Sequence, residues 1–108
     1  MEMELKNISE EDQILIRTQN SEYRFSVTDP EERRGLLSGG SLGDRQRDAV
    51  LVGMLGITDG LKSDISSLKT GGRALFYLKS NYGVERLITS VITGIARKQA
   101  SGNEKRAA

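Results

Sequence analysis

Residues 14–27 decide the fold, and they read ILIRTQNSEYRFSV. Apolar residues or threonine occupy every second position in both halves of this stretch, at Ile14, Ile16, Thr18, Tyr23, Phe25 and Val27. Because successive side chains of a strand point to opposite faces, each triplet lies on one face. The polar residues 19–21 between the two runs suit a tight reversal. The stretch therefore predicts a β-hairpin with one apolar and one polar face.

Four later stretches are also typical of strands. They are Leu36–Leu37, the apolar run Ala49–Ile57, residues 73–79 and the long segment that follows Gly83. Gly53 and Gly56 indicate a bulge or bend in the second of these, and residues 80–83 (Ser-Asn-Tyr-Gly) indicate a hairpin turn. In the last segment, alternation places Leu87, Thr89, Val91, Thr93 and Ile95 on one face and Arg86, Ile88, Ser90 and Ile92 on the other.

Strand follows strand without the alternating helices of a parallel sheet, so the fold class we expect is all-β. The architecture expected is a small antiparallel barrel or two-layer sandwich of five to six strands, since closure removes exposed edges. Leu61, Ile65 and Leu68 have helical spacing, which predicts one short helix or an irregular loop within residues 58–72.

The 108-residue chain is long enough for one domain. We expect a polar lead-in over residues 1–12, a single β domain over 13–96 and a disordered basic tail over 97–108, where no apolar residue larger than alanine occurs. Two variable, Gly-containing loops, residues 38–48 and 58–72, interrupt the β domain. No stretch approaches the length of an apolar membrane span, and the N-terminus lacks an apolar signal, so a cytoplasmic protein is expected.

The sequence contains neither cysteine nor histidine, which removes thiol chemistry, Cys/His zinc sites and the most common general base. Residues 39–43 (Gly-Gly-Ser-Leu-Gly) match the nucleophile elbow of α/β-hydrolases, but that elbow depends on a histidine base. The loop carboxylates do not follow the spacing of a calcium loop; they are Asp44, Asp48, Asp59 and Asp64. We therefore expect no catalytic residue, no metal, no cofactor and no enzymatic activity, with an enzyme that uses carboxylates alone as the remaining catalytic alternative.

Basic residues on the outer faces of the predicted strands are the one constellation that indicates a ligand. They are Arg17, Arg24, Arg73, Lys79 and Arg86. Residues 55–108 hold nine Lys/Arg against four Asp/Glu, whereas residues 1–54 hold seven against eleven. A small barrel with a basic face and the aromatic residues Tyr77 and Tyr82 would suit single-stranded nucleic acid.

Residues 17–25 (Arg-Thr-Gln-Asn-Ser-Glu-Tyr-Arg-Phe), with Asp29-Pro30, Gly39-Gly40 and residues 89–92 (Thr-Ser-Val-Ile), carry one resemblance. This R-T-x-N-S-x-Y hairpin turn and the later T-S-x-V segment are similar to a group of small uncharacterised bacterial proteins. The resemblance implies a hairpin and carries no activity or site. The function expected from the residues is a non-enzymatic interaction module that binds a protein, with a nucleic-acid-binding barrel as the alternative and no membrane partner. The sequence predicts no oligomeric state.

Overall fold

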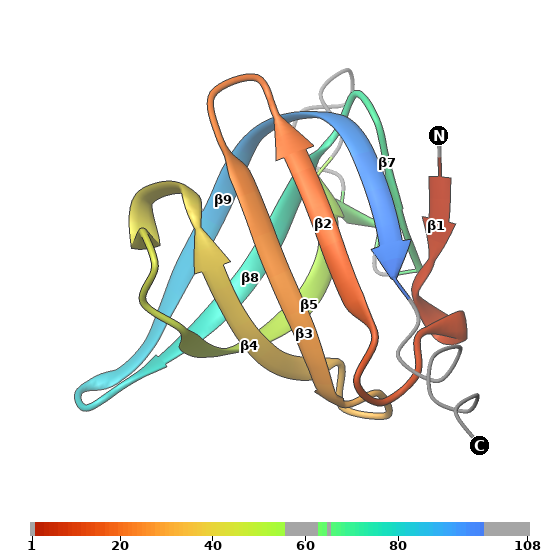
Figure 1. The fold of residues 1–108 in the computed structure, drawn as a ribbon. Coiled ribbons are helices and arrows are strands. Elements are labelled where there is room, and N and C mark those ends of the chain that lie inside the picture. Colours follow the sequence, from red (N-terminus) through yellow and green to blue (C-terminus); the bar gives the residue numbers. More distant parts are fainter. Residues whose placement is uncertain (1, 56–62, 65, 99–108) are drawn as a thin grey trace.

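The computed structural model describes residues 2–55, 63–64 and 66–98 of the chain (Figure 1). Six strands form a closed antiparallel barrel: β2 (Gln13–Thr18), β3 (Glu22–Asp29), β4 (Arg34–Gly39), β5 (Arg47–Leu55), β8 (Arg73–Ser80) and β9 (Gly83–Lys98). Each of these strands pairs with the next along the chain, and pairing of β9 with β2 completes the ring. The expected all-β barrel is therefore confirmed, and the sandwich alternative is not.

The remaining described elements are short. They are β1 (Glu2–Glu4), the 3-10 turns η1 (Leu5–Asn7) and η2 (Gly40–Leu42), β6 (Ser63–Asp64) and β7 (Ser67–Lys69). β6 extends the barrel sheet at the end of β5, while β1 and β7 form a separate two-stranded antiparallel sheet. The short helix expected over residues 58–72 is wrong where it can be judged, because Leu68 lies in β7 as a buried strand residue. Leu61 and Ile65 lie outside the described residues.

The hairpin that the sequence predicted is confirmed as β2 and β3. Ile14 pairs with Phe25 and Ile16 with Tyr23, and all four side chains are buried inside the barrel. The Thr18 hydroxyl oxygen accepts the Ser21 N–H at 3.0 Å and closes the turn. The polar face, with its arginines, lies on the outside of the barrel as expected.

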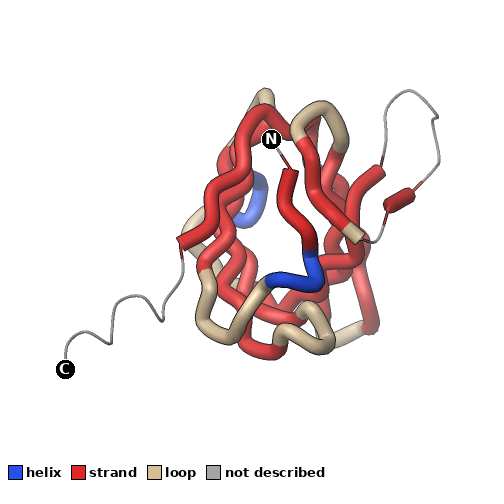
Figure 2. The backbone as a smooth tube through the Cα atoms, turned by 90° about the vertical axis from the view of Figure 1, so that its right-hand side faces the viewer, coloured by secondary structure: helices blue, strands red, loops and turns tan. Residues whose placement is uncertain are grey.

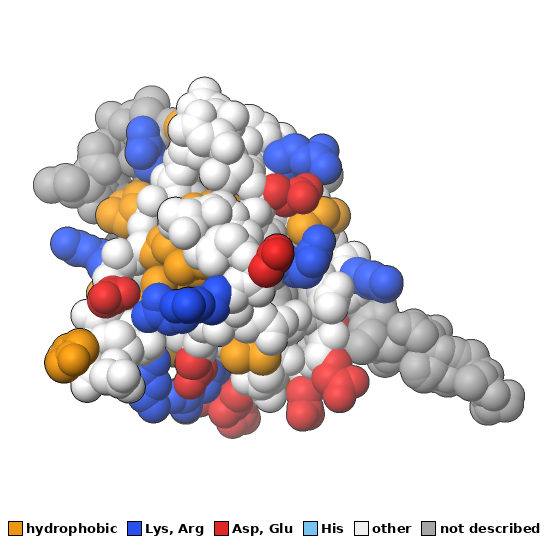
Figure 3. All heavy atoms as spheres, turned by 60° about the vertical axis from the view of Figure 1, so that its left-hand side comes forward, with side chains coloured by type: hydrophobic (Ala, Val, Ile, Leu, Met, Phe, Trp, Pro, Cys, Tyr) orange, Lys and Arg blue, Asp and Glu red, His pale blue; other side chains and the backbone are white. Residues whose placement is uncertain are grey.

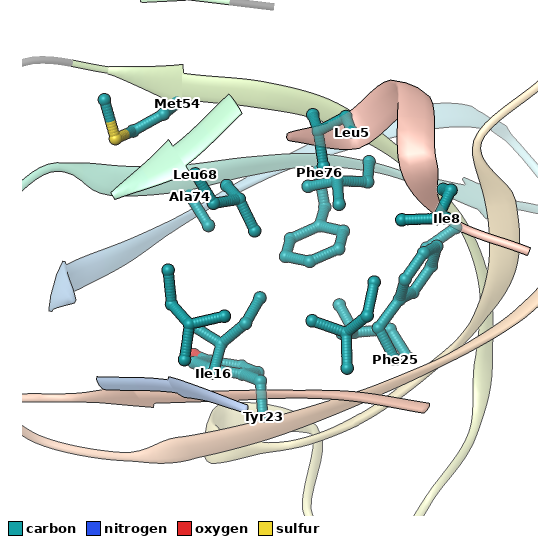
Figure 4. Packing of buried hydrophobic residues seen from close by; sticks show 14 of the residues in the cluster. Leu5, Ile8, Ile16, Tyr23, Phe25, Met54, Leu68, Ala74 and Phe76 are labelled. Carbon is teal, nitrogen blue, oxygen red and sulfur yellow. The ribbon is translucent and has the colours of Figure 1, made fainter. Parts of the chain in front are cut away.

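The barrel interior is filled by side chains. The Phe25 and Phe76 rings meet at its centre, with their centroids 5.4 Å apart and their planes tilted by 58° (Figure 4). Leu5 and Ile8, which precede the barrel strands, and Leu68 of β7 are buried in the same cluster. Figure 2 shows the N-terminal strand and η1 lying across one end of the ring of strands. The side chains of the described residues therefore fill the interior as a packed core, as in other barrels of small strand number.

The residues that we expected to flank the β domain are joined to it. The lead-in residues Leu5, Ile8 and Asp12 are buried. The Asp12 carboxylate forms an ion pair with Arg97, whose Nη2 lies 2.8 Å from Oδ2. The same oxygen accepts a hydrogen bond from the Ser9 N–H at 2.8 Å. β9 runs to Lys98, two residues past Ala96, where the β domain was expected to end, and residues 99–108 lie outside the described part.

β5 contains the bulge that its glycine indicated. Leu51 pairs with Phe76 and Gly53 with Leu75, so Val52 is the extra residue. Gly53 has a φ of 153°, which residues with a side chain rarely adopt. The strand bends here as it passes from β4 to β8, which confirms a bulge at Gly53, while Gly56 lies outside the described residues.

The simple alternation expected along β9 is wrong beyond Thr89. Thr89, Ile92 and Ile95 are buried, whereas Thr93 is exposed. One extra β9 residue lies between the pairs with Leu75 and Arg73 on β8, and another lies between the pairs with Arg17 and Thr18 on β2. Each irregularity shifts the side-chain alternation by one residue, so a single strand can bend and pair with two walls of the barrel.

Candidate functional site

The five predicted basic residues all lie exposed on the outside of the barrel, in three separate places. Arg17 and Arg24 lie on the β2–β3 wall, and the Arg17 guanidinium pairs with the Glu22 carboxylate at 3.2 Å. Arg73 and Lys79 occupy opposite ends of β8, six residues and thus about 20 Å apart. Arg86 accompanies Lys79 on the β8–β9 hairpin.

The barrel surface carries both signs of charge between these places. Figure 3 shows acidic and basic side chains interspersed over the face in view. Ion pairs account for part of this mixture, including Arg34 with Asp48 at 3.5 Å and Arg47 with Glu85 at 3.4 Å. The five residues therefore do not form one continuous basic patch.

The β8–β9 hairpin carries the exposed apolar side chains of the described residues. It continues past the last pair with β5 and projects from the barrel at the lower left of Figure 1. The register sets Lys79 opposite Val84 and Tyr77 opposite Arg86, and directly opposed residues share a face of the sheet. Alternation adds Ile88 to that face. We call these five residues, Tyr77, Lys79, Val84, Arg86 and Ile88, the hairpin face.

The exposed fractions on the hairpin face are high for apolar residues. They are 43% for Tyr77, 68% for Val84 and 44% for Ile88, and Tyr82 at the hairpin tip is fully exposed. Scattered single apolar residues are normal on a protein surface, whereas a contiguous patch marks a binding site. The hairpin face places three exposed apolar side chains and two basic groups on one side of a hairpin, which makes it the candidate binding surface.

A hollow of about 130 Å³ adjoins the hairpin face. Val50, Tyr77, Lys79 and Val84 line it together with the Arg34–Asp48 pair. Under the hairpin, Arg47 Nη2 donates to the Lys79 carbonyl oxygen at 3.2 Å. Arg47 thus ties the hairpin to β5 from below, while Lys79 and Arg86 have no ion-pair partner within the described part of the chain.

A second hollow, of about 340 Å³, lies on the outer wall formed by β3, β2 and β9. Its lining residues are Gln13, Leu15, Arg24, Ala96, Arg97 and Lys98. Arg97 is held by Asp12 and by the Asn7 carbonyl oxygen, to which its Nη2 donates at 2.7 Å. Arg24 and Lys98 are the cations of this hollow that form no ion pair among residues 2–55, 63–64 and 66–98.

The described residues do not form the nucleophile elbow or the metal site that the sequence motifs brought into question. Ser41 belongs to η2 on the barrel surface, and no strand-to-helix elbow surrounds it. Among the described residues, no group of three or more acidic side chains could hold a metal ion. Of the four carboxylates expected in loops, Asp48 lies in β5 and is paired with Arg34, Asp64 lies in β6, and Asp59 lies outside the described residues. No helix in the described part has the length and apolarity needed to cross a membrane.

The sequence reasoning missed the apolar part of the hairpin face. It chose Tyr77, Lys79 and Arg86 for their charge or ring and left Val84 and Ile88 aside. The signal was present, because Val84, Arg86 and Ile88 alternate on one face directly after the predicted turn. Reading that face as apolar with one charge would have indicated an exposed binding surface.

Comparison with known proteins adds no relative to this picture. No family model, no curated protein and no solved structure matches the chain. The resemblance of the residue 17–25 turn to small bacterial proteins therefore stays a prediction, and the function has to be inferred from the geometry.

Proposed function

We propose that this protein is a non-enzymatic interaction module that binds a partner protein through its hairpin face. The observation that carries the proposal is the exposure of Tyr77, Val84 and Ile88 on one projecting hairpin. Among the described residues, apolar side chains pack the barrel interior, which supports an outer surface as the place where a partner binds. The cytoplasmic location stays a prediction.

Aliphatic side chains favour a protein partner over a nucleic acid. Burying a valine or isoleucine side chain contributes on the order of 1–3 kcal/mol, and a partner protein can cover Val84 and Ile88 with apolar groups of its own. Nucleic-acid surfaces instead combine basic grooves with several aromatic platforms. The hairpin face has one aromatic ring among five residues, and Tyr82 lies apart from it in the turn.

Site-specific photo-crosslinking tests the proposal. A benzophenone amino acid is placed at Tyr77, where one aromatic ring replaces another, or at the exposed control position Glu31 in the β3–β4 turn. In lysate of the source organism, the probe at position 77 is expected to capture a discrete protein that the probe at 31 does not. Val84→Glu should abolish this crosslink without lowering the melting temperature. Equal crosslinking from both positions, or none from position 77, would refute the proposal.

The second hollow favours one competing function, nucleic-acid binding along the β2–β9 wall. Arg24 and Lys98 flank it as unpaired cations of the described chain. If this function holds, single-stranded oligonucleotides bind at low salt, their affinity falls steeply as salt rises, and Arg24→Glu weakens binding more than Arg86→Glu does. Our proposal predicts that oligonucleotides bind neither to this hollow nor to the hairpin face.

A further inference from the structure

The first half of β9 is paired along one side only. Its residues Gly83–Ile88 pair with β8, whereas pairing with β2 begins at Ile92 and continues to Lys98. The β8 residues opposite Glu85–Ile88 remain paired with β5 in the barrel wall, whereas β2 ends its pairing with β9 at Ile92. An edge of the sheet is therefore open here, although the barrel itself is closed.

The register tells which backbone groups lie on this open edge. A two-residue turn, Asn81-Tyr82, joins Ser80 to Gly83, so Gly83, Glu85 and Leu87 exchange hydrogen bonds with β8. The alternate residues Val84, Arg86 and Ile88 then direct their N–H and C=O groups away from β8. None of these three forms a backbone hydrogen bond outside the β8 ladder in the described chain. All three side chains are exposed, and no described segment other than β8 pairs with these residues.

We propose that this edge binds an extended segment of the partner protein as an added strand. The inference rests on the proposed function and names its chemistry. An added strand would satisfy the six open N–H and C=O groups, while its alternate side chains would lie beside Val84, Arg86 and Ile88 on the hairpin face. Exposed edges that carry apolar residues are the usual template for such pairing.

The side chains of the edge specify the incoming sequence. Val84 and Ile88 call for apolar residues opposite them, and the unpaired Arg86 between them calls for a carboxylate. The segment therefore has the pattern apolar–x–Asp/Glu–x–apolar, which is the same in either strand direction. Lys79 on the neighbouring strand adds a second positive charge on the same face.

Charge argues against a second copy of this chain as the occupant. A two-fold antiparallel pairing centred on the edge would set Arg86 opposite Arg86 of the other copy. Like charges directly opposite one another destabilise a strand pair. A carboxylate-bearing partner removes this repulsion, and we therefore assign the edge to a different protein.

Fluorescence anisotropy with a labelled peptide tests the inference. The peptide has the core Val-Thr-Glu-Thr-Ile, and two forms of it carry N-methyl groups either on the Val, Glu and Ile amides or on the two Thr amides. For an antiparallel added strand we expect the unmodified and Thr-methylated peptides to bind alike and the other form to bind about tenfold or more weakly, since only its methyl groups then face β9. The reverse order of the two methylated peptides would show a parallel added strand. Arg86→Glu should weaken binding of the Glu peptide and favour a peptide with Lys in its place, which a loss of folding would not do.

The outcomes separate this inference from the proposed function. If both methylated peptides bind equally while Val84→Glu abolishes binding, the partner uses side-chain contacts alone. Strand addition is then refuted and the proposed function stands. If no peptide binds at millimolar concentration, or if sedimentation shows a dimer that Val84→Pro dissociates, the assignment of the edge to an acidic segment is also refuted. The proposed function itself would be refuted if the probe at position 77 of the otherwise unchanged protein gave no crosslink, or gave the same crosslinks as the probe at position 31.

Discussion

Phe25 and Phe76 contact each other from opposite walls of the barrel, and neither side chain is exposed to solvent. Their contact links β3 to β8, strands that do not pair with each other in the ring. The position of Phe25 follows from its alternation in the first hairpin. Its partner ring could not be identified from the sequence, because alternation says which face a residue occupies but not which residue it meets.

Phe25→Ala should lower the free energy of unfolding by about 3–5 kcal/mol, the cost of removing a buried aromatic side chain. Urea denaturation measures this loss. Tyr82→Ala is the matched control, since Tyr82 is fully exposed and its loss should change stability by about 0.5 kcal/mol or less. A cost below about 1 kcal/mol for Phe25→Ala would mean that the ring does not support the core.

Arg97 is a second residue on which the barrel depends. Its Nη2 lies 2.8 Å from the carboxylate of Asp12, whose side chain is 2% exposed, and its Nε donates to the same oxygen at 2.9 Å. The pair joins the end of β9 to the segment that precedes β2. The sequence analysis placed Arg97 in a basic tail because no apolar residue larger than alanine follows it. A buried acid that is distant in sequence leaves no local signal.

Arg97→Met should destabilise the protein by about 3 kcal/mol, because it leaves the Asp12 carboxylate buried without its cation. Arg86→Met, on the same strand but without an ion pair among the described residues, should cost about 0.5 kcal/mol or less. Chemical denaturation of both variants makes the comparison. Equal, small losses would show that the Asp12–Arg97 pair contributes little to stability.

Among the elements, β5 and β9 show how far sequence patterns reach. Gly53 indicated the bulge in β5, because glycine tolerates the backbone conformation that a bulge requires. The irregularities of β9 contain Thr89, Ser90 and Thr93, which are ordinary strand residues. Thr89 provides a hydrogen-bond acceptor where the β8–β9 backbone pairing is interrupted. Its buried hydroxyl oxygen accepts the Ala74 N–H at 3.0 Å. A threonine at this place has no feature that distinguishes it beforehand from any other strand threonine.

Two glycines of the loop after β4 differ in how closely their surroundings pack against them. Gly40 has a φ of +51°, and a Cβ atom there would lie 2.2 Å from the ring of buried Tyr23. Gly43 has a φ of +64° and open space around it. The sequence indicated only a flexible Gly-rich loop, because contact between a glycine and a ring from another strand depends on the completed barrel.

Gly40→Ala should therefore cost more than Gly43→Ala. Both variants lose about 1–3 kcal/mol because alanine is strained at a positive φ, and Gly40→Ala loses about 1–3 kcal/mol more through the collision with Tyr23. Thermal or urea unfolding of the two variants isolates the difference. If Gly43→Ala proves equally costly, the packing of Gly40 on Tyr23 cannot be the cause.

For the molecule as a whole, period-two spacing predicted an antiparallel barrel or two-layer sandwich, with one buried face and the arginines pointing outward. It did not predict that Arg17, Arg73 and Arg86 would lie on separate parts of the surface, because that depends on the strand order and on where each strand bends. It also could not show that the β8–β9 hairpin extends past its neighbours. The length of overlap between strands is a property of the folded barrel, and the candidate site arises from it.

The open edge of β9 is the feature on which the proposed binding rests, and residue-resolved amide hydrogen exchange of the free protein tests it directly. The amides of Val84, Arg86 and Ile88 should exchange within about tenfold of the unprotected rate, while those of Glu85 and Leu87 should exchange about 100-fold or more slowly because they bond to β8. Equal protection of all five amides would show that another segment or another copy already covers this edge.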